Sequence, residues 1–106
     1  MNSKELLDYN VFRETAKKFN LDFIALFGSY YNGTPNENSD IDLIIDAQFT
    51  LGYDKIEEIK CYLKKIFKKN IDIITTRQMI SSLICGYVWR LKEYEVIYNQ
   101  NFYSNN

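Results

Sequence analysis

The segment from Asp40 to Asp46 constrains the fold most strongly, because carboxylate and aliphatic side chains alternate along it. Successive side chains of an extended segment point to opposite faces, so Asp40, Asp42 and Ile44 share one face. The other face is apolar and consists of Ile41, Leu43 and Ile45. A helix would spread both sets around its circumference. The pattern therefore predicts a strand that covers a core with one face and carries two carboxylates on the other.

Three further short runs have the length and apolar content of strands, and helical periodicity fills the spaces between them. Strands are expected at 23–27, 40–46, 71–74 and, as a sheet edge, 94–98. Helices are expected at 3–19, 53–69 and 77–92. Ser3 is the expected N-cap of the first helix and Asn20 its end, and the polar segment 30–39 is expected to be a loop that opens with one helical turn. Strands that alternate with helices predict an α/β (α+β) domain around one small sheet.

The length of 106 residues allows one hydrophobic core. We therefore expect a single domain over residues 1–98, followed by a polar tail, 99–106, that frays. The first 20 residues carry charges throughout, and no apolar stretch approaches the ~20 residues of a membrane span. These features predict a cytoplasmic protein that does not act on a membrane.

The charge balance and the residue types exclude several classes of function. Lys and Arg number 13 and Asp and Glu number 14, whereas a protein that grips a long nucleic acid needs a basic excess. No histidine is present, which excludes Ser-His-Asp and Cys-His catalysis. Cys61 and Cys85 lie in apolar helical patterns without a histidine to join them at zinc, so both are expected to be reduced core residues.

The chemistry is expected at Gly28-Ser29, which ten residues separate from Asp40-Ile41-Asp42. Gly28 has no Cβ, so a phosphate can approach its backbone, and Ser29 adds a hydroxyl and an N–H. Two carboxylates this close repel each other unless a cation lies between them, and Mg²⁺ binds through carboxylates and substrate phosphates. Asp72, on a later strand, would complete a two-ion site in which one ion holds a triphosphate and the other activates a hydroxyl.

A purely structural interpretation of these residues is the alternative. Gly28-Ser29 would then be an ordinary turn, and the aspartates would be strand residues that face solvent. At ordinary residue frequencies, the four fixed positions recur by chance about once in 10⁵ starting points. Aspartate is also depleted in strands, so two of them on one face need an explanation. Both points favour the chemical interpretation.

The run Phe27-Gly28-Ser29, then 39–45 with its Asp-Ile-Asp, and later Ile71-Asp72-Ile73-Ile74 resembles the minimal nucleotidyltransferases of the DNA polymerase β-like superfamily. The resemblance covers roughly residues 5–98. It implies a small mixed β-sheet with helices packed on one side. It also implies that Gly28 and Ser29 bind the triphosphate of ATP and that Asp40, Asp42 and Asp72 are the catalytic, Mg²⁺-binding carboxylates.

The chain departs from that family at Asn32, where many members carry an arginine. Without this positive charge, a phosphate contact from the loop is in doubt, but the three aspartates are all present. Asp46 is expected to be a solvent-facing strand end and Arg77 a surface residue at a helix start. The lysines at 64, 65, 68 and 69 are expected to form a solvated face that complements the helix dipole.

Three hypotheses about function remain open at the level of sequence. A domain of this size leaves no room for an acceptor-binding lobe, so the acceptor pocket is expected from another copy or from a separate protein. The resemblance implies an antitoxin that attaches AMP from ATP to a tyrosine of a helical HEPN-type toxin. The alternatives are a non-catalytic module that neutralises a helical partner by contact, and transfer to a small molecule. A homo-oligomer is left open.

Overall fold

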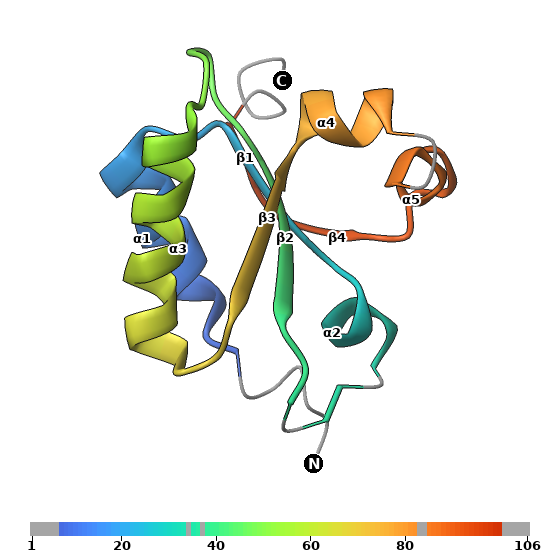
Figure 1. Ribbon diagram of the computed structural model, residues 1–106, viewed down its shortest axis with the longest axis horizontal. Coiled ribbons are helices and arrows are strands. Elements are labelled where there is room, and N and C mark those ends of the chain that lie inside the picture. Colours follow the sequence, from blue (N-terminus) through green and yellow to red (C-terminus); the bar gives the residue numbers. More distant parts are fainter. Residues whose placement is uncertain (1–6, 34, 37, 83–84, 101–106) are drawn as a thin grey trace.

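The computed structural model describes residues 7–33, 35–36, 38–82 and 85–100 (Figure 1). In chain order the elements are α1 (Tyr9–Phe19), β1 (Phe23–Phe27), α2 (Ser29–Asn32), β2 (Ile41–Asp46), α3 (Tyr53–Phe67), β3 (Ile71–Thr75), α4 (Thr76–Ser81), α5 (Cys85–Leu91) and β4 (Glu95–Asn99). The strands form one sheet in the order β3-β2-β1-β4. β2 and β3 are parallel, whereas β1 is antiparallel to both β2 and β4. The predicted fold class and the edge position of the last strand are therefore confirmed.

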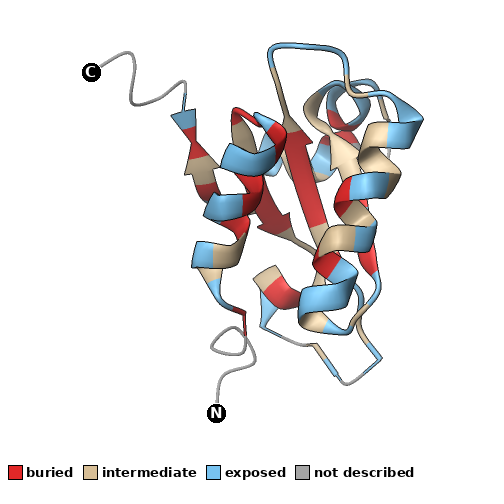
Figure 2. Cartoon of the chain, turned by 90° about the vertical axis from the view of Figure 1, so that its left-hand side faces the viewer, coloured by how far each residue is buried: buried red, intermediate tan, exposed pale blue. Residues whose placement is uncertain are grey.

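The larger core lies between the sheet and the two long helices, α1 and α3 (Figure 2). It contains Phe12 of α1, Leu26 of β1, Leu43 of β2 and Leu63 of α3, all with at most 1% of their surface exposed. The apolar face of β2 thus meets the core as its alternation predicts. This packing holds β2 in a fixed register against its neighbours.

A smaller core covers part of the opposite face, so helices are not confined to one side of the sheet. Ala25 and Ile44 point to this second face, where Met79 of α4 is fully buried against them. Val88 and Trp89 of α5 pack around the same cluster. Ile44 lies on the same side of β2 as Asp42. This part of the face is apolar and is therefore covered by α4 and α5.

The helix boundaries differ from expectation at two places. α1 begins at Tyr9, because the Asp8 carboxylate accepts a hydrogen bond of 2.9 Å from the Asn10 N–H. Ser3, the expected cap, lies outside the described residues. The single helix expected at 77–92 is two helices, because Thr75 starts α4 with a capping box and Ser82 adopts an extended backbone. Asn20, the expected end of α1, is the left-handed C-cap.

The sequence predicts that both cysteines are core residues. Cys61 is exposed on α3, so its assignment to the core was wrong. The buried residues of this helix are Ile59 and Leu63, and Cys61 lies between them in sequence and therefore points elsewhere on the helix. The side chain of Cys85 lies outside the described residues.

The sheet extends into the segment that was expected to fray. Asn99 pairs with Phe23, and the Gln100 N–H donates a hydrogen bond of 2.8 Å to the Asp22 carbonyl. Residues 101–106 lie outside the described part of the chain. Among the described helices, none is both long enough and apolar enough to cross a bilayer.

Candidate active site

The parallel pairing of β2 and β3 places two of the predicted carboxylates side by side. Asp42 and Asp72 are directly opposed Cα partners, so their side chains leave the same face of the sheet. Asp40 immediately precedes β2 and lies two residues from Asp42, on that same face. The hydrogen bond of 2.9 Å from the Ile41 N–H to the Asn70 carbonyl fixes where the two strands begin. The register thus gathers three aspartates that are up to 32 residues apart in sequence.

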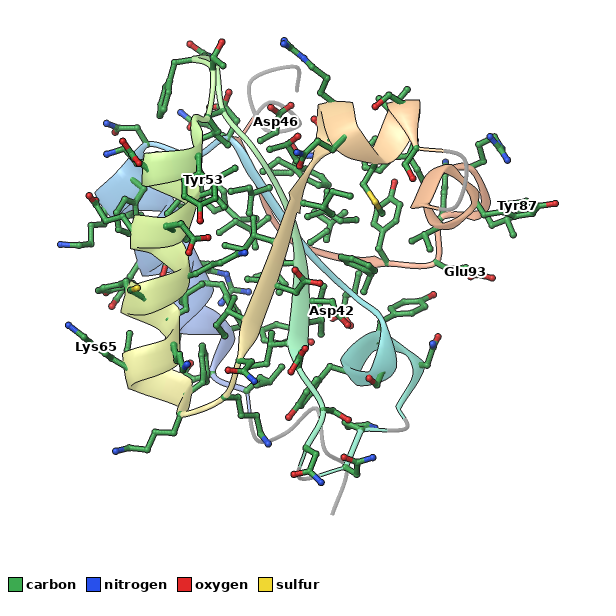
Figure 3. The ribbon with its side chains drawn as sticks, viewed as in Figure 1. Asp42, Asp46, Tyr53, Lys65, Tyr87 and Glu93 are labelled. Atoms are coloured by element: carbon green, nitrogen blue, oxygen red, sulfur yellow. The ribbon has the colours of Figure 1, made fainter. Side chains whose placement is uncertain are left out.

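The environment of Asp42 disfavours its negative charge. Burial, followed by the charges of Asp72 and then Asp40, raises the pKa of its carboxyl group from 3.8 to about 6. Asp42 is half-buried, whereas Asp40 and Asp72 are exposed. Figure 3 shows Asp42 on the lower part of the sheet, on the side of α2. A positive ion at this position would relieve the repulsion that the three carboxylates exert on one another.

The glycine-serine turn lies directly against this carboxylate. Phe27, the last residue of β1, pairs with Asp42, so the chain turns at Gly28 beside it. Gly28 has φ 74° and ψ −151°, a backbone region that essentially only glycine occupies. A Cβ added there would collide with the Asp42 carboxylate. Ser29 is the first residue of α2, the helical turn expected after the strand. The site therefore requires glycine for both backbone conformation and space.

The donor set suits magnesium, although it does not form a closed cage. In the described ranges, no three side chains of His, Cys, Asp or Glu meet as ready ligands of one ion. Asp40 and Asp72 are near enough to Asp42 to raise its pKa, and all three side chains offer only oxygen donors. Carboxylates that leave room for water and substrate phosphates are what Mg²⁺ prefers.

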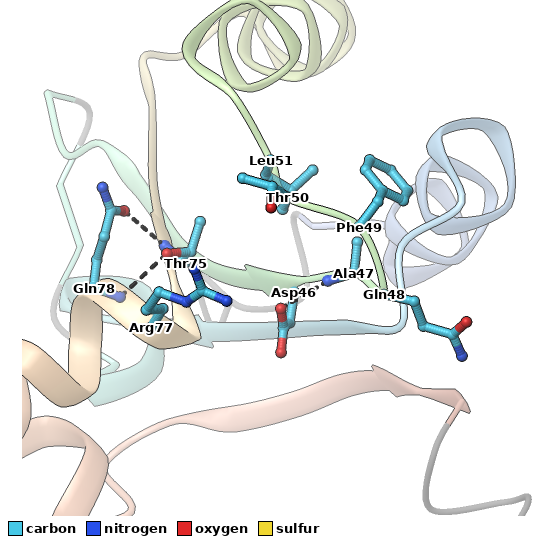
Figure 4. Close-up of a pocket in the computed structure, with 9 residues that line it drawn as sticks. All are labelled: Asp46, Ala47, Gln48, Phe49, Thr50, Leu51, Thr75, Arg77 and Gln78. Carbon is cyan, nitrogen blue, oxygen red and sulfur yellow. Dashed lines mark hydrogen bonds between the residues drawn. The ribbon is translucent and has the colours of Figure 1, made fainter.

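Asp46 and Arg77 lie at the opposite end of the parallel strand pair. They line a cavity of about 250 Å³ with Thr75 and Gln78 (Figure 4). The Asp46 carboxylate accepts a hydrogen bond of 2.8 Å from the Ala47 N–H. Six residues of extended chain separate Asp46 from Asp40, a span of about 20 Å. Asp46 therefore cannot join the carboxylate site, in agreement with its expected role as a strand end.

The sequence interpretation missed a basic cavity beside Asp40. This cavity, of about 220 Å³, is lined by Asn38, Ser39, Asp40, Lys64, Lys68, Lys69 and Asn70. In the sequence analysis these lysines were attributed to the helix dipole alone, and no contact with another segment was expected. The signal was the group of lysines at the end of the helix, but only the parallel pairing of β2 and β3 brings that helix end to Asp40.

Because the pKa of Asp42 is raised, we expect the metal-free protein to lose stability as pH rises. A raised pKa means that the folded state holds this proton more tightly than the unfolded chain, so ionisation of Asp42 disfavours folding. The penalty is absent below about pH 4 and complete above about pH 6. After allowance for the half-exposed carboxyl group, we expect about 1 kcal/mol.

Denaturant unfolding in a chelator measures this effect by comparing the wild type with Asp42→Asn at pH 4 and pH 7. The variant should be the more stable protein at pH 7. Its advantage in unfolding free energy over the wild type should be about 1 kcal/mol larger at pH 7 than at pH 4. Titrating groups that do not interact with Asp42 cancel in this difference. A difference that is constant with pH would contradict the assignment of the penalty to Asp42.

Comparison with known proteins gives a consistent result. Residues 10–103 match the family described as "Polymerase beta, Nucleotidyltransferase". A Methanocaldococcus jannaschii protein named as a candidate protein adenylyltransferase is 33% identical over 86 residues, which are 81% of this chain and 84% of that protein. The protein adenylyltransferase MntA of Thermococcus cleftensis is 31% identical over 74 residues, 70% of this chain and 71% of the relative.

Solved structures share the fold. A toxin–antitoxin complex with AMP-PNP contains a chain that matches with a TM-score of 0.73 and 24% identity, over 88% of this chain and 74% of that one. A complex of the tri-AMPylated Shewanella oneidensis HEPN toxin with the MNT antitoxin matches with a TM-score of 0.65 and 19% identity, over 92% of this chain and 74% of that one. At these identities the likeness establishes the fold alone.

Proposed function

Because the chain belongs to the polymerase β nucleotidyltransferase family, we propose that it is a Mg²⁺-dependent protein adenylyltransferase that moves AMP from ATP to a hydroxyl group. The observation that carries this proposal is that Gly28 lies against the Asp42 carboxylate and that Asp42 is paired with Asp72. A turn that can bind phosphates thus lies beside carboxylates that can bind cations. The relatives named as protein adenylyltransferases support the choice of AMP as the transferred group.

In this proposal each residue of the site has a defined task. Asp40, Asp42 and Asp72 hold Mg²⁺, which when bound neutralises phosphate charge and lowers the pKa of the attacking hydroxyl group. Gly28 lets the triphosphate approach the backbone, and the Ser29 hydroxyl and N–H donate to it. The acceptor oxygen attacks the α-phosphorus, the bond to pyrophosphate breaks and the hydroxyl proton passes to solvent. The protein contributes mainly positioning and charge, which needs no histidine.

The acceptor that we propose is a tyrosine of a helical HEPN-type toxin, so that the chain acts as an antitoxin. The support comes from solved structures with a similar fold, which are toxin–antitoxin complexes, one with AMP-PNP and one with a tri-AMPylated HEPN toxin. Because ATP is the donor, we place the reaction in the cytoplasm.

The test is AMP transfer to a HEPN-type toxin of the same genome, which is sought first in the gene beside that of this chain. The purified pair is incubated with Mg²⁺ and ATP labelled at the α-phosphate, and the modified residue is found by peptide mass spectrometry. The wild type should label a tyrosine of the toxin, and Asp40→Asn should not. Absence of label with the wild type, or equal label with Asp40→Asn, would refute the proposal.

A second candidate, neutralisation by contact alone, is favoured by one observation. Ile80, Tyr87 and Leu91 on α4 and α5 expose 62%, 61% and 59% of their surface, which a partner could cover. Toxicity in cells separates the two functions. If the chain is an enzyme, the double variant Asp40→Asn/Asp42→Asn loses neutralisation. If contact suffices, that variant protects as well as the wild type does.

A further inference from the structure

The pairing of the strands fixes the backbone at Asp42 but not at Asp40. Asp42 lies within β2, where it pairs with Phe27 on one side and with Asp72 on the other. Asp40 precedes β2 and has no Cα partner in either pairing. After it, the N–H of Ile41 donates a hydrogen bond to the chain that leads into β3. What holds Asp40 from the other side must come from the residues before it.

A closed turn occupies this position. The Asn36 N–H donates a hydrogen bond of 2.8 Å to the Ser39 hydroxyl oxygen, and the Ser39 N–H donates one of 3.1 Å back to the Asn36 carbonyl. The side-chain oxygen of Asn36 accepts a third bond, of 2.8 Å, from the Asn38 N–H. Asn36 thus takes part in all three bonds. The turn ends at Ser39, which is the residue directly before Asp40.

Asparagine and serine are common turn residues, so this turn also has a purely structural interpretation. Its place in the chain argues for more. Asp40, Asp42 and Asp72 carry like charges on one face of the sheet and repel one another until a cation binds. Asp40 is exposed, so packing offers little resistance to this repulsion. Hydrogen bonds on both sides of Asp40, in the turn before it and at Ile41 after it, keep its backbone from moving away from the site.

We propose that Asn36 and Ser39 are positioning residues, which hold the Asp40 carboxylate in place for Mg²⁺. This inference rests on the proposed function and adds two residues to its site. Neither side chain contacts the ion or the reacting atoms in this account. Their contribution is a site that is formed before the ion arrives, so that binding does not have to order the chain that leads to Asp40.

Positioning of this kind predicts a specific pattern of losses. When the turn is weakened, the ion itself must order the chain, so the apparent affinity for Mg²⁺ falls. Once the ion is bound the site is the same as before, so AMP transfer at saturating Mg²⁺ should stay within about twofold of the wild type. Because Asn36 and Ser39 act through one turn, loss of both should have little more effect than loss of either.

The experiment measures the apparent Mg²⁺ affinity by calorimetric titration of ATP at a series of free Mg²⁺ concentrations. The turn variants are Ser39→Ala, Asn36→Ala and their combination, and each single change removes the acceptor of one hydrogen bond of the turn. Each should need about fivefold more Mg²⁺ than the wild type for half-maximal ATP binding. The combination should need about as much as each single variant. Ser39→Thr keeps the hydroxyl oxygen and should bind as the wild type does.

Two control variants remove matched hydrogen bonds outside the site. Ser81→Ala deletes the exposed bond from the Ser81 hydroxyl to the Gln78 carbonyl. Asn10→Ala deletes the exposed bond that the Asn10 side chain accepts from Arg13. Both controls should show the Mg²⁺ dependence of the wild type. In a chelator, the melting temperatures of the turn variants should fall no further than those of the controls.

The outcomes separate this inference from the function on which it rests. If the wild type shows no Mg²⁺-dependent ATP binding, the proposed function itself fails. If the wild type binds ATP and the turn variants share its Mg²⁺ dependence, the inference is overturned and the proposed function stands. The same holds if the controls weaken as much as the turn variants, or if the two single losses add in the combination. AMP transfer by the turn variants that stays low at saturating Mg²⁺ would also overturn it, because the two residues would then act on the reaction itself.

Discussion

Asp42→Asn should lower AMP transfer by on the order of 10³-fold and leave a protein that is folded and slightly more stable than the wild type. Asp42 is the half-buried carboxylate between Gly28 and Asp72, so its replacement removes the central negative charge of the site and one of its two oxygen donors. Stability rises because its ionised form is disfavoured by burial and by two neighbouring aspartates. Loss of activity together with gain of stability is the mark of a functional charge.

Labelled-AMP transfer and denaturant unfolding are measured on the same preparation. The matched control is Asp46→Asn, which changes the same residue type in the same strand but at its opposite end. Its amide oxygen can still accept the hydrogen bond from the Ala47 N–H. We expect it to retain activity within a few-fold. Equal loss of activity in both variants would show that the strand, and not the Asp42 site, is what matters.

Gly28→Ala should destabilise the protein by about 2–4 kcal/mol and abolish nucleotide binding. Its backbone region is nearly exclusive to glycine, and the new methyl group would collide with the Asp42 carboxylate. Because the collision lies in the site itself, relief by movement of either group would separate the turn from the carboxylate. The effect therefore reaches both folding and binding.

Gly33→Ala is the control for the backbone effect alone. Gly33 has φ 79° and ψ 20°, the left-handed region, and nothing lies within 4 Å of an added Cβ. Its substitution should cost about 1 kcal/mol, the usual penalty for a left-handed alanine. Thermal or denaturant unfolding compares the two variants. Similar costs at the two glycines would mean that Gly28 does not press against Asp42.

The sequence was informative wherever one pattern had one structural solution. The alternation along 40–46 permits only a strand. The same alternation places its carboxylates on one face of the sheet. The pairing of Asp42 with Asp72 was expected only in outline, because a parallel register depends on how α3 packs and not on the strands alone. The three aspartates are in the predicted place, while their roles as ligands remain proposals.

The features that were missed depend on contacts across the fold. The break at Ser82 is an extended backbone conformation at the end of α4, which the hydrophobic period across 77–92 does not reveal. Cys61 is exposed because α3 buries only a narrow stripe around Ile59 and Leu63. The basic cavity arises where the end of α3 meets the start of β2, two segments more than 20 residues apart. No local pattern records such an encounter.

Calorimetric titration of ATP into the protein, with Mg²⁺ and with a chelator, tests the central claim most directly. The claim is that Gly28, Ser29 and the three aspartates form one metal-dependent nucleotide site. We expect binding with Mg²⁺, none in the chelator, and loss of the metal-dependent binding in Asp40→Asn/Asp42→Asn. Binding that does not depend on Mg²⁺, or that survives in the double variant, would contradict the claim.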